Sequence, residues 1–158
     1  MTWETAKQAI DFYFHHSIDS PTRNIGFYGG EPLLKFDLIR RIVEYAEAYS
    51  KGKQLSFNIT TNGSLLSGNI VRYFSEHHIK TLISLDGIKK VQDKNRVFSS
   101  GTGTFDVIAT RLEEIRKDYP EYYHTISFNS VLTPGNDIDA VMKDKMICLS
   151  NKLEENTR

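Results

Sequence analysis

Three short stretches of the chain place glycine beside acidic, hydroxyl or amide side chains, each directly after an apolar run. They read Gly29-Gly30-Glu31-Pro32, Thr60-Thr61-Asn62-Gly63 and Ser84-Leu85-Asp86-Gly87. Glycine accepts positive φ and lets a ligand approach the backbone closely. Carboxylates accept hydrogen bonds from an ammonium group or a sugar hydroxyl, and hydroxyl and amide groups can bond a carboxylate. The stretches therefore favour a site for a small polar ligand, although ordinary turns after strands use the same residue types.

Apolar runs and amphipathic segments alternate along the chain and define the elements that would position these residues. Helices are expected to begin near Trp3, Leu38, Ile70, Phe105 and Ile138, and strands are expected at 24–28, 55–60, 81–84 and 125–132. A long loop is expected from 88 to about 103. Strands that alternate with helices favour a mostly parallel sheet, whose ligands bind at the carboxyl ends of the strands. The three stretches should then meet at one edge of the sheet.

Composition limits the classes of partner. The chain has 158 residues, enough for one domain, and its 20 Lys and Arg balance its 20 Asp and Glu. This balance does not favour nucleic acid or an acidic membrane surface as a partner. Apolar runs fall short of the roughly 20 residues that span a bilayer, and the first residues do not resemble a secretory signal. We therefore expect a cytoplasmic protein that binds neither nucleic acid nor membrane.

The cysteine and histidine residues of the chain do not indicate a metal site. The single cysteine, Cys148, cannot form a zinc or iron–sulfur site alone, and its apolar neighbours favour a buried packing role. His15-His16 and His77-His78 are adjacent pairs, and neighbouring side chains on a helix point about 100° apart, which disfavours chelation of one ion. The residues themselves predict no metal site and no catalytic nucleophile.

Longer strings at the same places resemble the core of radical S-adenosylmethionine (radical SAM) enzymes. GFYGGEPLL at 26–34 resembles the family's GGEP segment, FNITTNGSLL at 57–66 its third strand, and ISLDG at 83–87 its fourth. The wording is most similar to the subgroup with a C-terminal SPASM or twitch extension, which includes anaerobic sulfatase-maturating enzymes and thioether-forming peptide maturases. The resemblance runs to about Asp139 and implies an α/β fold, a partial TIM-type barrel with about four parallel strands and helices outside.

The resemblance also implies S-adenosyl-L-methionine (SAM) as cofactor. Gly29, Gly30 and Glu31 would bind the amino group of its methionine end, Ser84 the ribose or carboxylate, and Arg96 the carboxylate. Thr60 and Asn62 would line the same opening. Asp86, whose carboxylate could accept a hydrogen bond from an ammonium group or a ribose hydroxyl, completes the expected cofactor-binding set. Asn129 and Val131 would lie near the adenine.

The chain departs from the family at the cluster. The family binds a 4Fe-4S cluster through a CxxxCxxC motif, and this sequence contains neither that motif nor the SPASM cysteines. We therefore expect residues 1–158 to be a truncated radical SAM core domain that is inactive alone. The parent enzyme would cleave SAM reductively to a 5′-deoxyadenosyl radical and modify a peptide or protein substrate. Two alternatives stay open: a non-catalytic remnant that binds SAM or a peptide, and a poorly folded chain with an exposed strand edge.

Overall fold

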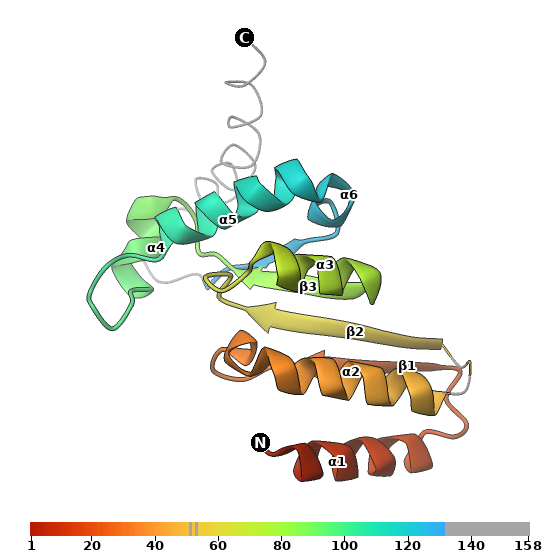
Figure 1. Ribbon diagram of the computed structural model, residues 1–158. Helices are drawn as coiled ribbons and strands as arrows, with labels where there is room; N and C mark the ends of the chain where they lie inside the picture. Colours follow the sequence, from red (N-terminus) through yellow and green to blue (C-terminus); the bar gives the residue numbers. More distant parts are fainter. Residues whose placement is uncertain (51, 53, 132–158) are drawn as a thin grey trace.

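The computed structural model describes residues 1–50, 52 and 54–131. One four-stranded parallel sheet has the order β1-β2-β3-β4, with β1 at Thr22–Phe27, β2 at Gln54–Thr61, β3 at Ile79–Ser84 and β4 at Ser127–Asn129 (Figure 1). The helices are α1 (Trp3–His16), η1 (Pro32–Lys35), α2 (Phe36–Ser50), α3 (Gly68–Glu76), α4 (Lys89–Asn95), α5 (Phe105–Asp118) and α6 (Pro120–Tyr123). The expected α/β fold with a parallel sheet of four strands is confirmed.

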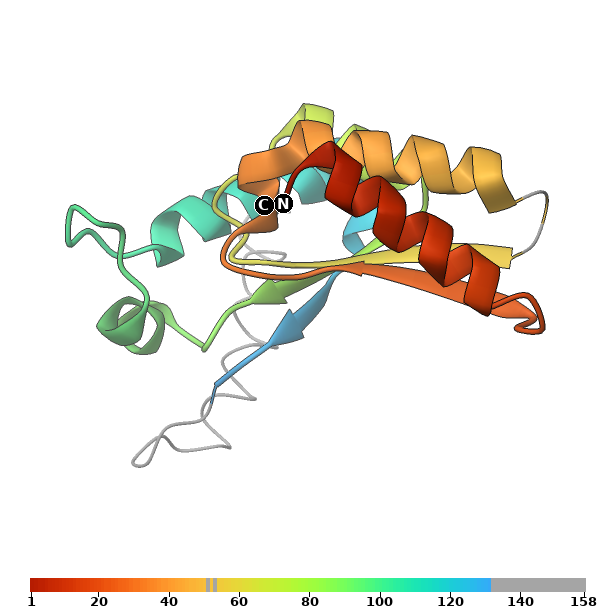
Figure 2. The same cartoon turned by 90° about the horizontal axis from the view of Figure 1, so that it is seen from below.

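The hydrophobic core lies between one face of the sheet and the helices α2, α3 and α5, and the buried face of α1 (Trp3–His16) extends it beside α2 (Figure 2). Successive strand residues point to opposite faces, so Phe57 and Ile59 of β2 and Ile79 and Ile83 of β3 are buried against these helices. The intervening positions of β2 form the other face and are polar: Ser56, Asn58 and Thr60. In the described part of the chain, no helix covers that polar face.

The outer strand β1 is fixed by α1 and the turn that follows it. Arg23 is buried, donates from Nε to Ser17 Oγ at 3.0 Å and from Nη2 to Ser17 O at 2.8 Å, and lies over the ring of Phe14. The backbone N–H of Asn24 donates to Tyr13 Oη at 3.0 Å. These contacts satisfy polar groups at the edge of the sheet and orient α1 beside it.

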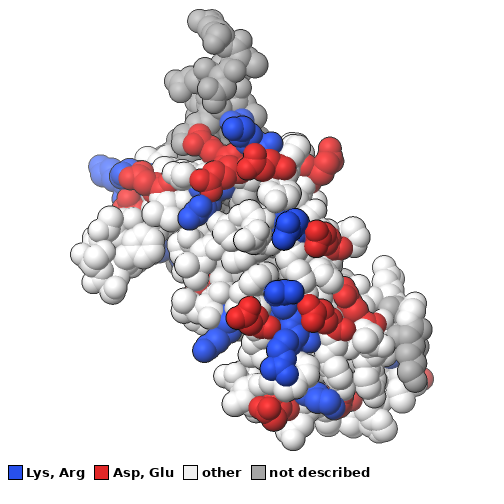
Figure 3. All heavy atoms as spheres, viewed as in Figure 1, with Lys and Arg blue, Asp and Glu red and all other residues white. Residues whose placement is uncertain are grey.

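The outer helix surfaces carry charges of both signs (Figure 3). Several form ion pairs one turn apart, such as Arg40–Glu44 on α2, Arg72–Glu76 on α3 and Arg111–Glu114 on α5. Such exposed pairs contribute little to stability, about 0.3–0.5 kcal/mol each. None of the helices in the described ranges is both long and apolar enough to cross a membrane.

Two elements differ from the sequence expectations. The expected loop from 88 to about 103 contains α4 and then a turn closed by an antiparallel bridge between Val97 and Gly103. The short α6 was not expected either. The loop prediction was wrong because α4 spans only seven residues, three of them lysine or glutamine near its start, so its helical period is weak. The expected helix from Ile138 and the thiol of Cys148 lie outside the described residues.

Candidate functional site

The three glycine-containing stretches meet at the carboxyl edge of the sheet, where all the strand arrows end (Figure 1). The register places Phe27 beside Ile59, Thr61 beside Ile83 and Ser84 beside Asn129, so neighbouring strands end within one or two residues of each other. The expected convergence of the stretches at one edge is therefore what the fold produces.

Glu31 joins the ends of β1 and β2. Its Oε1 accepts hydrogen bonds from Leu33 N at 3.0 Å and Thr61 Oγ1 at 2.7 Å, and its Oε2 accepts from Asn62 N at 2.8 Å. It thereby caps the short helix η1, which begins with Pro32. A carboxylate has about four lone-pair sites, and three are used here, so Glu31 can accept one further donor such as an ammonium group.

Gly29 and Gly30, the two residues before Glu31, have open space beside their α-carbons. A Cβ atom placed on either glycine would meet no described heavy atom within 4 Å. Gly29 also has φ +150°, a conformation that side chains other than hydrogen rarely adopt. The backbone at the end of β1 is therefore accessible to a ligand.

Polar groups of β2 and β3 line the adjacent part of the edge. Thr60 and Ser84 alternate with the buried Thr61 and Ile83, so they lie on the polar face and are half-buried. Asn62 closes the turn after β2, because its Oδ1 accepts from Ser64 N at 2.9 Å and from Ser64 Oγ at 2.7 Å. Its Nδ2 group keeps two donors that these bonds do not use.

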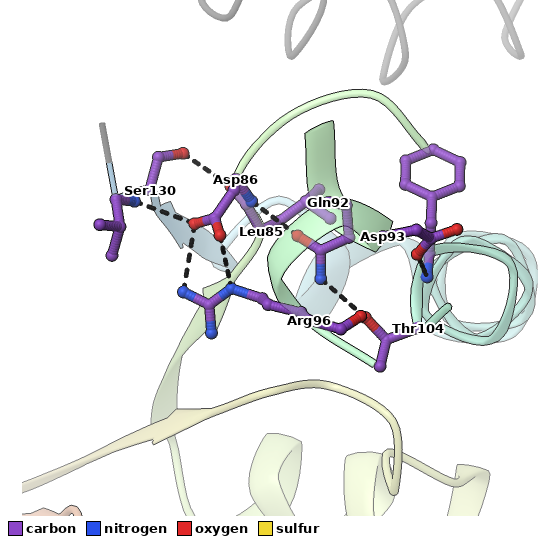
Figure 4. Close-up of polar contacts among 9 residues, drawn as sticks. Leu85, Asp86, Gln92, Asp93, Arg96, Thr104 and Ser130 are labelled. Atoms are coloured by element: carbon purple, nitrogen blue, oxygen red, sulfur yellow. Dashed lines mark hydrogen bonds and ion pairs between the residues drawn. The ribbon is translucent and has the colours of Figure 1, made fainter. Parts of the chain in front are cut away.

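Asp86 and Arg96 form a bidentate ion pair beyond the end of β3 (Figure 4). Arg96 Nε donates to Oδ2 at 2.7 Å and Nη2 donates to Oδ1 at 3.1 Å. Oδ1 also accepts from Val131 N at 2.9 Å, and the side chain of Asp86 is only 4% exposed, against 28% for Arg96. Asp86 therefore binds the segment after α4 and the segment after β4 to the end of β3.

Gln92 is a buried member of this network that the sequence did not identify. It is 0% exposed, its Oε1 accepts from Asp86 N at 2.8 Å, and its Nε2 donates to Thr104 Oγ1 at 2.9 Å. Thr104 Oγ1 in turn donates to Arg96 O at 3.0 Å. The available signal was its position four residues after Ile88, which would place both on one face of a helix, but the region was expected to be a loop.

The described residues do not form a metal centre. Within residues 1–50, 52 and 54–131, no three or more His, Cys, Asp and Glu side chains are grouped to bind a metal ion. His16 Nδ1 pairs with Phe12 O and His77 Nδ1 with Glu47 Oε1, so these histidines have structural partners. An iron–sulfur cluster requires several thiolates, and the sequence has one cysteine. A 4Fe-4S cluster therefore has no ligand set in this sequence.

No family model matches the chain. An uncharacterized protein of Methanocaldococcus jannaschii is 37% identical over 101 residues, 64% of this chain and 34% of that protein. A cysteine-type anaerobic sulfatase-maturating enzyme of Clostridium novyi is 31% identical, with 61% of this chain and 26% of the enzyme covered. A radical SAM cyclopropyl synthase of Paramaledivibacter caminithermalis is 29% identical, with 84% and 27% covered. The chain thus spans about a third or less of the length of these relatives.

Solved structures agree in fold. The structure described as native anSMEcpe with bound AdoMet aligns with a TM-score of 0.79 at 22% identity, covering 92% of this chain and 39% of that one. A second, described as the same protein with bound AdoMet and a Kp18Cys peptide, aligns with a TM-score of 0.70 at 24% identity, covering 80% and 35%. At these identities the alignments show a shared fold.

Proposed function

We propose that this chain, which is related in sequence and fold to radical SAM enzymes, binds SAM across the carboxyl ends of β1, β2 and β3. Residues 1–158 would be the part of a radical SAM core domain that positions SAM. The observation that supports this most is the meeting of three strand ends that together offer open backbone, a carboxylate with spare acceptor capacity and an arginine. These are the groups that an amino acid joined to a nucleoside requires.

The methionine end of SAM would lie at the ends of β1 and β3. Glu31 would accept a hydrogen bond from the ammonium group, which is favoured because both groups are charged. Gly29 and Gly30 would let the ligand approach the backbone, since the space beside them is open. Arg96 would donate to the carboxylate from its guanidinium.

The ribose would lie over the polar face of β2 and β3. Thr60 and Ser84 present hydroxyl groups there, and Asn62 has amide donors at the turn that follows β2. Asp86 belongs to the same region and pairs with Arg96 there. Asn129 and Val131, at and beyond the end of β4, would flank the adenine, as the register beside Ser84 allows.

We do not assign the cleavage of SAM to the residues of this chain. In radical SAM enzymes a 4Fe-4S cluster supplies the electron that cleaves SAM, and this sequence lacks the ligands for it. We therefore propose that the chain alone does not turn over SAM, and that a complete enzyme of this kind would act on a peptide or protein in the cytoplasm. Support for a polypeptide substrate comes from the sulfatase-maturating relatives.

Titration calorimetry of the full chain with SAM tests the site. Glu31→Gln and Ser84→Ala should each weaken SAM binding about tenfold, because each removes one hydrogen bond to the ligand in a partly buried site. Ser99→Ala, on the exposed turn after α4, is the matched control and should bind SAM as the wild type does. Binding that ignores both Glu31→Gln and Ser84→Ala would contradict the proposed site.

The absence of cluster ligands also favours a second role, a module that binds SAM without cleaving it. Anaerobic reconstitution of the chain with iron and sulfide, followed by addition of SAM and a reductant, tests whether the chain can cleave SAM. The expected result is no stable cluster absorbance and no 5′-deoxyadenosine. Appearance of both would contradict the assignment of an inactive chain.

A further inference from the structure

We infer that Asp86 is a positioning residue, which orients Arg96 for the ligand and makes no contact with the ligand itself. The inference rests on the proposed function, because it takes SAM as the ligand. It differs from the sequence expectation, in which Asp86 was one of the groups that bind the cofactor directly.

Asp86 differs from Glu31 in its burial and in its charged partner, not in the number of hydrogen bonds that it accepts. Oδ2 accepts from Arg96 Nε, and Oδ1 accepts both from Arg96 Nη2 and from Val131 N. The side chain is 4% exposed, so little of its surface can meet a ligand. A sugar hydroxyl would have to reach a carboxylate that is buried against Arg96, and disturbing a buried ion pair is costly.

Arg96 keeps donors for another anion. Its guanidinium has five N–H groups, of which Asp86 takes one on Nε and one on Nη2. No hydrogen bond among the described residues uses Nη1, which points away from Asp86 (Figure 4). The planar fork of arginine matches a carboxylate, and SAM has one carboxylate. Asp86 therefore determines the orientation in which Arg96 meets that group.

Hydrogen bonds also fix the backbones of Asp86 and Arg96. Gln92 accepts from Asp86 N and donates to Thr104 Oγ1, which donates to Arg96 O. Figure 4 shows the buried amide of Gln92 between Asp86 and Thr104, and the bond from Thr104 Oγ1 to Arg96 O completes the connection between the two paired residues. An arginine ordered before the ligand arrives loses less conformational freedom on binding, which improves affinity.

Two ligands separate orientation from direct contact. SAM has the carboxylate that Arg96 would bind, whereas 5′-methylthioadenosine keeps the ribose and adenine but lacks the carboxylate and the ammonium. Asp86→Asn should weaken SAM binding about tenfold and change the affinity for 5′-methylthioadenosine less than about twofold, measured by calorimetry on the full chain. Equal weakening for both ligands would show that Asp86 binds the sugar and would overturn the inference.

The control is Asp93→Asn. Asp93 is on α4, as Gln92 is, and its Oδ1 accepts from Phe105 N at 2.9 Å, so the substitution also removes one negative charge from the same segment. It should leave both affinities unchanged, because the hydrogen bond of Asp93 in the described structure is to Phe105 N and not to Arg96. A loss of SAM affinity equal to that of Asp86→Asn would assign the effect to the general charge of the segment instead.

A double-mutant cycle adds a second criterion. If Asp86 acts through Arg96, then Asp86→Asn should cause no further loss of SAM affinity in an Arg96→Gln background. Losses that add in the double variant would indicate a separate contact between Asp86 and the ligand and would contradict the inference.

Nuclear magnetic resonance distinguishes a failure of this inference from a failure of the proposed function. Without any ligand, the Nε–H of Arg96 should exchange slowly with solvent in the wild type and in Asp93→Asn, and fast in Asp86→Asn. A wild-type chain that binds neither nucleoside would refute the proposed function, while a slowly exchanging Arg96 signal would still support its orientation by Asp86. Fast exchange in the wild type would refute that orientation whatever the ligand data show.

Discussion

Glu31 and Asp86 are two acidic residues at the ends of strands in one sheet, yet their surroundings differ. Glu31 accepts hydrogen bonds from two backbone N–H groups and a hydroxyl, all uncharged, and is half-buried beside open glycines. Asp86 is buried against a guanidinium. In the first case the negative charge has no cationic partner among these contacts and can attract one. The charge of Asp86 is already balanced by Arg96, so Asp86 orients Arg96 and does not itself attract a cation.

The largest difference between the two residues should be in stability. Asp86→Ala leaves Arg96 without its buried partner and should lower the free energy of unfolding by about 3 kcal/mol. Glu31→Ala removes the cap of η1 and should cost about 1 kcal/mol. Urea denaturation of both variants measures the difference. An equal or reversed order would contradict the division of roles between the two residues.

Gln92→Leu should have the next largest effect. It leaves the buried N–H of Asp86 without its acceptor, which costs about 2 kcal/mol of unfolding free energy. Urea denaturation again provides the measurement, with Gln54→Leu on the exposed start of β2 as the control. A loss below about 0.5 kcal/mol would mean that the polar network around Asp86 does not require Gln92.

Tyr122 has a buried hydroxyl that belongs neither to the contacts of Glu31 nor to those of Asp86, so it allows a comparison with both. Its Oη contacts Thr81 Oγ1 at 2.6 Å and donates to Ile79 O at 2.8 Å, and burial raises the pKa of Tyr122 from its ordinary 10.0 to about 12. As pH rises from 10 to about 12, Tyr122 loses its proton in the unfolded chain but keeps it in the folded chain. The free energy of unfolding should therefore fall over this pH range.

Tyr122→Phe should lower stability at neutral pH by about 1.5 kcal/mol, because it removes these hydrogen bonds. It should also remove the part of the alkaline decline that this residue causes. Thermal melts of the wild type and the variant from pH 8 to pH 11 measure both effects. Parallel declines in the two proteins would contradict the assigned pKa.

The smallest predicted effects are on stability and compare two glycines. Gly103 lies against Asp93 in the segment after α4, and Gly30 precedes Glu31. A Cβ on Gly103 would lie 2.1 Å from Cγ of Asp93, and moving that carboxylate would break its bond to Phe105 N. Gly103→Ala should therefore cost about 1 kcal/mol. Gly30→Ala meets open space and should change stability by less than about 0.5 kcal/mol. If thermal melts gave similar losses of stability for the two variants, the surroundings of Gly103 and Gly30 would be packed alike, which would contradict this prediction.

The sequence predicted much of this arrangement. The alternating apolar runs located β1, β2 and β3 within three residues, and the strings around Glu31 and Ser84 predicted a resemblance to radical SAM enzymes that the relatives and the shared fold confirm. Strand ends were predictable because a parallel sheet gathers them at one edge.

The partners of the site residues were not predictable. Asp86 meets Val131 across 45 positions of sequence, and Thr61 meets Glu31 across 30, so their pairing depends on the finished fold. Gln92 was passed over because a seven-residue helix gives too little periodicity to distinguish it from a loop. Residue type alone assigned Asp86 to the ligand, whereas its buried ion pair favours a role in orienting Arg96.

The most direct test of the proposed site is a titration of the ¹⁵N-labelled chain with SAM, followed by backbone amide shifts. The proposal predicts that the shifts concentrate at the carboxyl edge, at Gly29, Gly30, Asn62, Gly63 and Gly87. Gly52, before the start of β2 at the opposite end of the sheet, should stay unchanged. Shifts that are absent, or that spread equally over both ends of the sheet, would contradict a SAM site at the strand ends.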